Sequence, residues 1–425
     1  MLNLTTKKIA KNTLYQLVGK VFTMGVTVLV TVLITRGYGR ELYGDFSLMQ
    51  GIPALFFIIT DFGLNAISVR EVSKNESKIY HYFVNVLIFR VVLSLIFIIL
   101  VAGLLQFFPY SQNLKFGIRL GLLLILTFSL HSTTNIIFQT KLRYDLSVLG
   151  QSLGYVLILG VSFFLVLSKA PVAWINFSYV IGGLLSFLIN FSLIKKLGIS
   201  TDFYLDLPLI KSLFKESLPL GIMFVFSQMN FKEDALLISV LRVPKWLNMS
   251  HSEAVGVYAL PYKIFEVALV VPTFFMNAVY PVLVRHMQEG EQRLLASFRR
   301  VLIFLASSGI VCGLLGAVFA SQIISIFGGA EFYRSIAVLQ ILVGGVFVFY
   351  LTQPLSWLII TLGKQIYLPY IYLASVAFNL IFNLVFIPRY SFYAAATITI
   401  VSEFLILVLL SYFAVKSWKA RFRNA

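Results

Sequence analysis

Long apolar stretches recur along the whole chain and are separated by short polar connections. Each stretch has at least the roughly 20 residues with which an α-helix crosses a bilayer. The chain is therefore predicted to be an all-α integral membrane protein. We expect about twelve transmembrane helices, near residues 14–35, 44–66, 82–106, 117–138, 147–168, 173–194, 217–241, 255–281, 301–326, 335–361, 366–387 and 392–415.

The first apolar stretch is not uniformly apolar. Polar residues recur along it at steps of three and four, which places them on one face of a helix: they are Thr13, Gln16, Lys20, Thr23, Thr27 and Thr31. A spanning helix with one polar face favours a polar cavity beside it, so we interpret this helix as part of a transport pathway. Two alternatives stay open. Threonines also pack at helix contacts in membranes, and the Lys20 side chain can extend to the cytoplasmic surface.

Three other basic residues lie within apolar stretches. They are Arg90 in the third, Lys232 in the seventh and Lys263 in the eighth. Charge at membrane depth is costly and marks a pathway or a paired site. A phosphate in a low-dielectric site needs charge-assisted hydrogen bonds. We therefore expect these residues and Lys20 to bind an anionic headgroup. For Arg90 the alternative is a position nearer the cytoplasmic surface.

Four acidic residues at membrane depth are candidates for coupling transport to an ion or a proton. They are Asp61, Asp234, Glu266 and Glu403. Each of the first three has a structural alternative. Asp61 would cap the end of its helix, Glu266 would neutralise Lys263 three residues before it, and Asp234 or its neighbour Glu233 would neutralise Lys232.

Composition supports the membrane assignment and explains the charge. Hydrophobic residues make up 59% of the chain and charged residues 12%, against about 25% charged residues in soluble domains. The chain has 34 Lys and Arg against 17 Asp and Glu. With both termini in the cytoplasm, 21 of the basic residues lie on the cytoplasmic side and nine on the opposite side. This bias follows the positive-inside rule, so the excess charge indicates topology and not nucleic-acid binding.

The chain divides into two halves of similar design. A polar connection at residues 201–216 is predicted to be a cytoplasmic linker between six-helix bundles at 1–200 and 217–425. The sequence GDFSL at 44–48 opens the second span, and GVYAL at 256–260 opens the eighth. Both units run in the same direction through the membrane. Parallel repeats of this kind predict a site between the halves, with Lys20 and Lys232 facing one cavity.

Several kinds of chemistry are not indicated. The sequence has no G-x-x-x-x-G-K-[ST] phosphate loop and no H-E-x-x-H motif. Cys312 is the single cysteine, so no disulfide framework or metal cluster is expected. We expect no enzymatic activity, no cofactor and no metal. Energy would come from an ion gradient, the membrane potential or the gradient of the substrate.

Four segments carry a resemblance to a known family. They are AKNTLY at 10–15, TRGYGRELYGDFSL at 35–48, DFGL at 61–64 and GVYALPYK at 256–263, running on to Tyr280 and Pro281. Together they resemble bacterial polysaccharide-export flippases of the multidrug/oligosaccharidyl-lipid/polysaccharide exporter superfamily. The resemblance implies two six-helix bundles around a central V-shaped cavity, lined by the first and seventh spans. The lipid II flippase branch usually has two further spans, and twelve argue against it.

The resemblance also implies a function. It is export of an undecaprenyl-diphosphate-linked oligosaccharide across the cytoplasmic membrane by alternating access, for surface polysaccharide synthesis. The expected partners are this lipid-linked substrate, membrane lipids, and a polysaccharide polymerase or glycosyltransferases. Cationic cavity residues of the family correspond here to the four basic residues named above. The competing hypotheses are a drug or organic-cation antiporter of the same fold and a non-transporting scaffold for a polysaccharide synthase.

Overall fold

The structure is a computed structural model that describes residues 4–199 and 204–422. Over these residues the chain forms helices and no strand. Short 3-10 turns join some of them. The α-helices are α1 (Leu4–Asp61), α2 (Leu64–Val72), α3 (Ile79–Leu104), α4 (Gln112–Thr140), α5 (Tyr144–Leu167), α6 (Val172–Lys195), α7 (Leu207–Val240), α8 (His251–Glu289), α9 (Glu291–Val318), α10 (Ala320–Phe327), α11 (Ser335–Gly344), α12 (Val346–Thr361), α13 (Leu368–Tyr390) and α14 (Phe392–Phe422).

The helices account for the predicted spans. Ten helical stretches among the described residues are long and apolar enough to cross a membrane. The first, Lys11–Val72, is 62 residues long and has room for both spans predicted there. α7 has 34 residues but is not among the ten, because polar and charged side chains interrupt its apolar sequence. The prediction of an all-α membrane protein with about twelve spans is confirmed.

A glycine separates the first two predicted spans. Gly39 has φ 77° and ψ −173°, which breaks the helical path within α1. L-residues rarely adopt this φ, whereas glycine has no Cβ to clash. The backbone N–H of Arg40, which follows the break, donates to the Glu331 carboxylate at 3.3 Å. The chain thus leaves one span and enters the next without an unsatisfied amide at this position.

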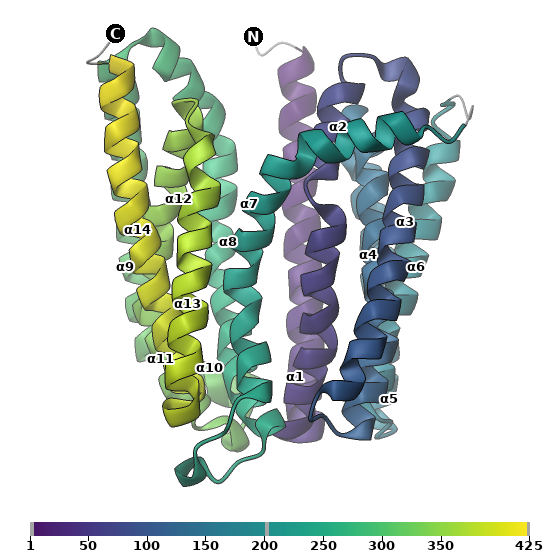
Figure 1. Cartoon of the computed structure of the whole chain (residues 1–425), viewed down its shortest axis with the longest axis vertical. Coiled ribbons are helices and arrows are strands. Elements are labelled where there is room, and N and C mark those ends of the chain that lie inside the picture. The colour runs from purple at the N-terminus through teal and green to yellow at the C-terminus, as the bar shows by residue number, and fades with distance from the viewer. Residues whose placement is uncertain (1–3, 200–203, 423–425) are drawn as a thin grey trace. The chain divides into compact units, whose positions relative to one another are not determined.

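The helices form two compact units. The first contains the chain up to Tyr38 and Asp45–Val225, and the second contains Gly39–Gly44 and the chain from Phe226 onward. In the first unit α3 packs on α4, and α6 packs on both α4 and α5. In the second, α12 packs on α8, α9 and α14, and α13 packs on α14. These neighbouring helices can be followed in Figure 1.

The two glycines that mark the sequence repeat meet in the structure. A Cβ on Gly44 would lie 2.8 Å from the backbone nitrogen of Gly256, and a Cβ on Gly256 would lie 3.2 Å from that of Gly44. Both residues belong to the second unit. Here the backbone at the start of the second predicted span crosses α8 directly, a close approach that small residues permit in membrane proteins. The repeat therefore marks a structural contact.

The start of α7 is part of the first unit. Leu213 is buried against Leu64, Ile67, Val86 and Ile136 of α2, α3 and α4. Residues 207–216 of the predicted linker are thus helical and packed, whereas 201–203 lie outside the described residues. The predicted division into residues 1–200 and 217–425 stays a prediction, as does the V-shaped cavity.

The segment that enters α7 is tied to α3 by a small polar cluster. The Asp206 carboxylate accepts from the Leu209 backbone N–H at 2.9 Å and lies 3.2 Å from Nε2 of His81. The backbone N–H of Asp206 donates to Asn85 Oδ1 at 2.8 Å. The hydrogen bond from Leu209, together with the bond to His81, lowers the pKa of Asp206 below its ordinary value of 3.8.

The backbone crossing predicts that added bulk at Gly256 is destabilising. In Gly256→Ala the new methyl group meets the Arg40 carbonyl oxygen. Overpacking of this kind costs about 1–3 kcal/mol, so we expect a lower melting temperature of the purified protein in detergent. Gly344→Ala is the matched control, because a Cβ there meets nothing within 4 Å. Equal melting temperatures for the two variants would contradict this account.

The Asp206 cluster predicts an acid-sensitive start to α7. Because the folded-state pKa lies below 3.8, the stabilisation is fully present above that pH and is lost as the pH falls through the folded-state pKa. We expect the Leu209 amide to lose protection from hydrogen exchange in this acid range, after correction for the intrinsic exchange rate. Asp206→Asn should weaken protection already at pH 7 and remove its dependence on pH.

Candidate substrate-binding site

The polar stripe on α1 divides into two environments. Lys20 is exposed, whereas Thr23 and Thr31 are buried. The hydroxyl of Thr23 donates to the Lys20 carbonyl oxygen at 3.1 Å, and the hydroxyl of Thr31 donates to the Thr27 carbonyl oxygen at 2.9 Å. These hydroxyls are therefore bonded to their own helix, which favours the packing alternative for the two buried threonines. Lys20, in contrast, lies on the exposed face of α1.

Arg90 and Asp61 lie together in the first unit. Arg90 is completely buried, and its guanidinium donates to Asp61 Oδ1 at 2.5 Å. It also donates to Asn65 Oδ1 and Thr133 Oγ1, both at 2.9 Å. Asp61, the last residue of α1, receives a further hydrogen bond from Ser132 at 3.1 Å. The cluster ties the end of α1 to α3 and α4.

This geometry changes the roles that we predicted for Arg90 and Asp61. The guanidinium of Arg90 is enclosed by protein acceptors, so the structure does not support a direct contact with a headgroup. Asp61 does lie at a helix end, as the structural alternative expects, but its carboxylate serves as the counter-charge of Arg90. No sequence pattern indicated Asn65 and Thr133, because hydrogen bonds between distant spans have no fixed spacing along the chain.

Lys232 and Lys263 meet at one carboxylate in the second unit. Nζ of Lys232 on α7 lies 2.6 Å from Oε1 of Glu266, and Nζ of Lys263 lies 3.0 Å from Oε2. Lys263 and Glu266 are three residues apart on α8. The side chains are only partly covered, with exposed fractions of 27%, 38% and 27% for Lys232, Lys263 and Glu266. The expected neutralisation of Lys263 by Glu266 is present, and it extends to Lys232.

Asp234 is the centre of a second polar cluster in the same unit. Its carboxylate accepts from the hydroxyls of Tyr258 and Thr399, both at 2.6 Å, and from the Asn383 amide at 2.7 Å. These donors come from α8, α14 and α13. Asp234 is buried, and its contacts differ from the alternative in which it neutralises Lys232. The convergence of four helices on one carboxylate is a tertiary feature that the sequence did not predict.

Two further acids lie on the buried side of these helices. Glu233 precedes Asp234 and is 7% exposed. With its amide oriented so that both ends are satisfied, Asn379 donates to Glu233 at 2.9 Å and to Asp234 at 3.2 Å. Glu403 on α14 is also buried and accepts a hydrogen bond from Thr352 of α12. Polar side chains thus supply hydrogen bonds to all three buried acids.

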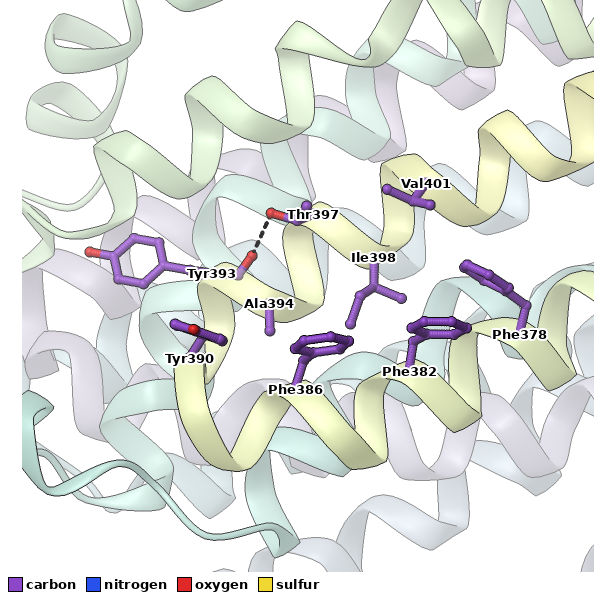
Figure 2. A pocket seen from close by; sticks show the side chains of 9 residues that line it. All are labelled: Phe378, Phe382, Phe386, Tyr390, Tyr393, Ala394, Thr397, Ile398 and Val401. Carbon is purple, nitrogen blue, oxygen red and sulfur yellow. Dashed lines mark hydrogen bonds between the residues drawn. The ribbon is translucent and has the colours of Figure 1, made fainter.

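An apolar groove lies between α13 and α14. Phe378, Phe382, Phe386 and Tyr390 follow one another at steps of four along α13, and α14 closes the other side (Figure 2). The groove has a volume of about 380 Å³, and no charged side chain lines it. It is therefore unsuited to a phosphate headgroup, in contrast to the lysine pair on α7 and α8.

Comparison with known proteins identifies the family. A family profile described as polysaccharide biosynthesis protein matches residues 9–287, which is more than half of the chain. The chain belongs to this polysaccharide biosynthesis family. A comparison with curated proteins gave no significant match.

Solved structures show which fold this family member has. It is similar to a lipid II flippase, MurJ, in an inward closed conformation, with a TM-score of 0.75 and 17% identity over 97% of this chain and 90% of that chain. It is equally similar to an inward-facing multidrug resistance transporter of the MATE family, at a TM-score of 0.75 and 14% identity over 94% and 95% of the two chains.

A third similar structure is a MOP superfamily transporter from Pyrococcus furiosus, with a TM-score of 0.63 and 13% identity over 97% of this chain and 96% of that chain. Its description states that reverse polarity of the binding pocket suggests a different function. At these identities the likeness shows a shared fold. The family member described here is therefore a multi-span membrane protein with the fold of MOP superfamily transporters.

The Arg90 cluster predicts that loss of Asp61 is more harmful than loss of both charges. Asp61→Ala leaves a buried guanidinium without its counter-charge, and breaking such a pair costs about 3–5 kcal/mol. We expect the double variant Asp61→Ala, Arg90→Leu to regain part of this stability. The measurement is the free energy of unfolding in mixed micelles. A double variant no more stable than Asp61→Ala would show that the pair is not the source of the loss.

Proposed function

We propose that this protein is a flippase that moves an undecaprenyl-diphosphate-linked oligosaccharide across the cytoplasmic membrane by alternating access. In this proposal the protein delivers the lipid-linked oligosaccharide for surface polysaccharide synthesis. It acts as a transporter and not as an enzyme. The observation that carries the proposal is the partly exposed lysine pair on α7 and α8, in a chain that belongs to a polysaccharide biosynthesis family.

The lysine pair has the chemistry that a diphosphate requires. The Lys232 and Lys263 ammonium groups both lie within hydrogen-bond distance of one carboxylate, so they are close enough to serve one small anion. Phosphate oxygens form short, charge-assisted hydrogen bonds with ammonium groups. We propose that Lys20, which is exposed on α1, also binds an anionic headgroup. We assign Arg90 a supporting role, since it holds the end of α1 through Asp61.

The buried acids are proposed to couple transport to a proton or another cation. Asp234 and Glu403 lie on helices of the second unit, and Asp234 is bonded to groups from three other helices. A change in its charge would alter contacts to all three helices together. The Tyr262 hydroxyl is buried and has no hydrogen-bond partner among the described residues. This hydroxyl is therefore able to form a new hydrogen bond when the charge of Asp234 changes. Glu266 and Asp61 pair with basic residues and are less suited to this task.

The proposal includes a location and partners. We place the protein in the cytoplasmic membrane with both termini in the cytoplasm, as the distribution of basic residues predicts. A glycosyltransferase would supply the lipid-linked substrate on the cytoplasmic side, and a polymerase would use it on the other side.

A drug or organic-cation antiporter is the second candidate, because the fold is shared with a MATE transporter. Organic cations need acidic and aromatic groups. Of the candidate acids in the second unit, Asp234 and Glu403 are buried and Glu266 is paired with lysine. The lysine pair is partly exposed, and this contrast favours an anionic substrate. Drug susceptibility of cells lacking the gene separates the two candidates, since the flippase predicts lost surface polysaccharide and unchanged susceptibility.

The flippase proposal predicts that the exposed lysines are required for export. Lys20→Ala or Lys232→Ala should abolish surface polysaccharide, because each removes a positive charge from the proposed headgroup site. The measurement is surface polysaccharide in cells that carry each variant, with membrane insertion checked by immunoblot. Lys364→Ala, in a polar connection, is the control and should export normally. Normal export by the double variant Lys20→Ala, Lys232→Ala would refute the cationic site.

A further inference from the structure

Glu266 occupies the place between the two lysines that an anionic ligand would take. Its Oε1 lies 2.6 Å from Lys232 and its Oε2 lies 3.0 Å from Lys263. One carboxylate therefore accepts from both ammonium groups, one on each of two helices. A phosphate bound by the same two nitrogens would need the same hydrogen-bond directions.

The partial exposure of this cluster distinguishes it from a closed ion pair. Arg90 is 0% exposed and has further protein acceptors around its guanidinium. Lys232 and Glu266 are each 27% exposed, and Lys263 is 38% exposed. A ligand in the surrounding medium can therefore reach the lysine cluster, whereas the arginine is already enclosed.

We propose that Glu266 is an internal counter-anion that the diphosphate headgroup must displace in order to bind. This inference rests on the proposed function and adds a residue that sets the affinity of its site. When the site is empty, Glu266 neutralises and positions the two lysines, so neither charge is left unpaired at membrane depth. When the headgroup arrives, the ammonium groups exchange the carboxylate for phosphate oxygens. When Glu266 returns, it helps to expel the headgroup.

This competition has a physical consequence for affinity. With Glu266 ionised, the three side chains carry one net positive charge, and a bound diphosphate is repelled by the displaced carboxylate nearby. Removing that negative charge without changing the size of the side chain leaves two positive charges for the ligand. The variant Glu266→Gln should therefore bind a diphosphate more tightly and release it more slowly. A transporter needs moderate affinity, because a substrate held too tightly is not released.

The test measures binding to the full-length protein in nanodiscs. The probe is undecaprenyl diphosphate without sugar, and undecaprenol is the uncharged comparison ligand. We expect Glu266→Gln to lower the dissociation constant for the diphosphate about tenfold or more, which corresponds to one strong charge interaction. Binding of undecaprenol should not change. In proteoliposomes the same variant should move substrate more slowly than the wild-type protein.

Two matched variants separate charge from structure. Glu71 also lies between two basic side chains, with Oε1 2.8 Å from Arg70 Nε and 2.8 Å from Lys74 Nζ. It lies outside the proposed site, so Glu71→Gln should not alter diphosphate binding. Glu266→Asp retains the negative charge on a shorter side chain and should keep the dissociation constant near the wild-type value.

The outcomes distinguish this inference from the proposed function. Tighter diphosphate binding in Glu266→Gln alone supports the counter-anion. Unchanged or weaker binding overturns it while the flippase proposal stands, provided that the wild-type protein prefers the diphosphate to undecaprenol. If neither the wild-type protein nor Glu266→Gln shows that preference, the headgroup site is refuted, and the counter-anion with it.

Discussion

The structure depends on one constraint: a charge at membrane depth must be paired, because water is not available to solvate it. Arg90 meets this constraint with Asp61 and two neutral acceptors in the first unit. Lys232 and Lys263 meet it with a shared Glu266 in the second. Each pair joins helices within its unit, and the pairs leave their charges with different capacities to accept a ligand.

The polar clusters differ in what they can do. The arginine cluster is buried and joins four helices, so its role is to stabilise their packing. The lysine cluster is partly exposed and holds its charge on flexible side chains, which suits reversible binding of an anion. The buried acids around Asp234 are bonded to neutral donors from several helices. The proposed roles in binding and in coupling therefore fall on different groups.

Much of the fold was accessible from the sequence, because hydropathy reports directly on the length and number of spans. The glycines at 44 and 256 were also visible as a repeat. Their direct contact was not, since a repeat in sequence does not say which copies touch. The start of α7 is a second example: residues 207–216 are predicted to be part of a linker, yet Leu213 is buried against α2, α3 and α4.

The sequence by itself determined the membrane class, the approximate spans and the small set of charged residues within them. These properties follow from the local composition of each segment and do not depend on the rest of the chain. Only the tertiary structure decided which charges pair. It enclosed Arg90 with Asp61 and brought Lys232 to a glutamate 34 residues away. Pairing depends on which helices become neighbours, and that choice is made by packing across the whole unit and not by spacing along the chain.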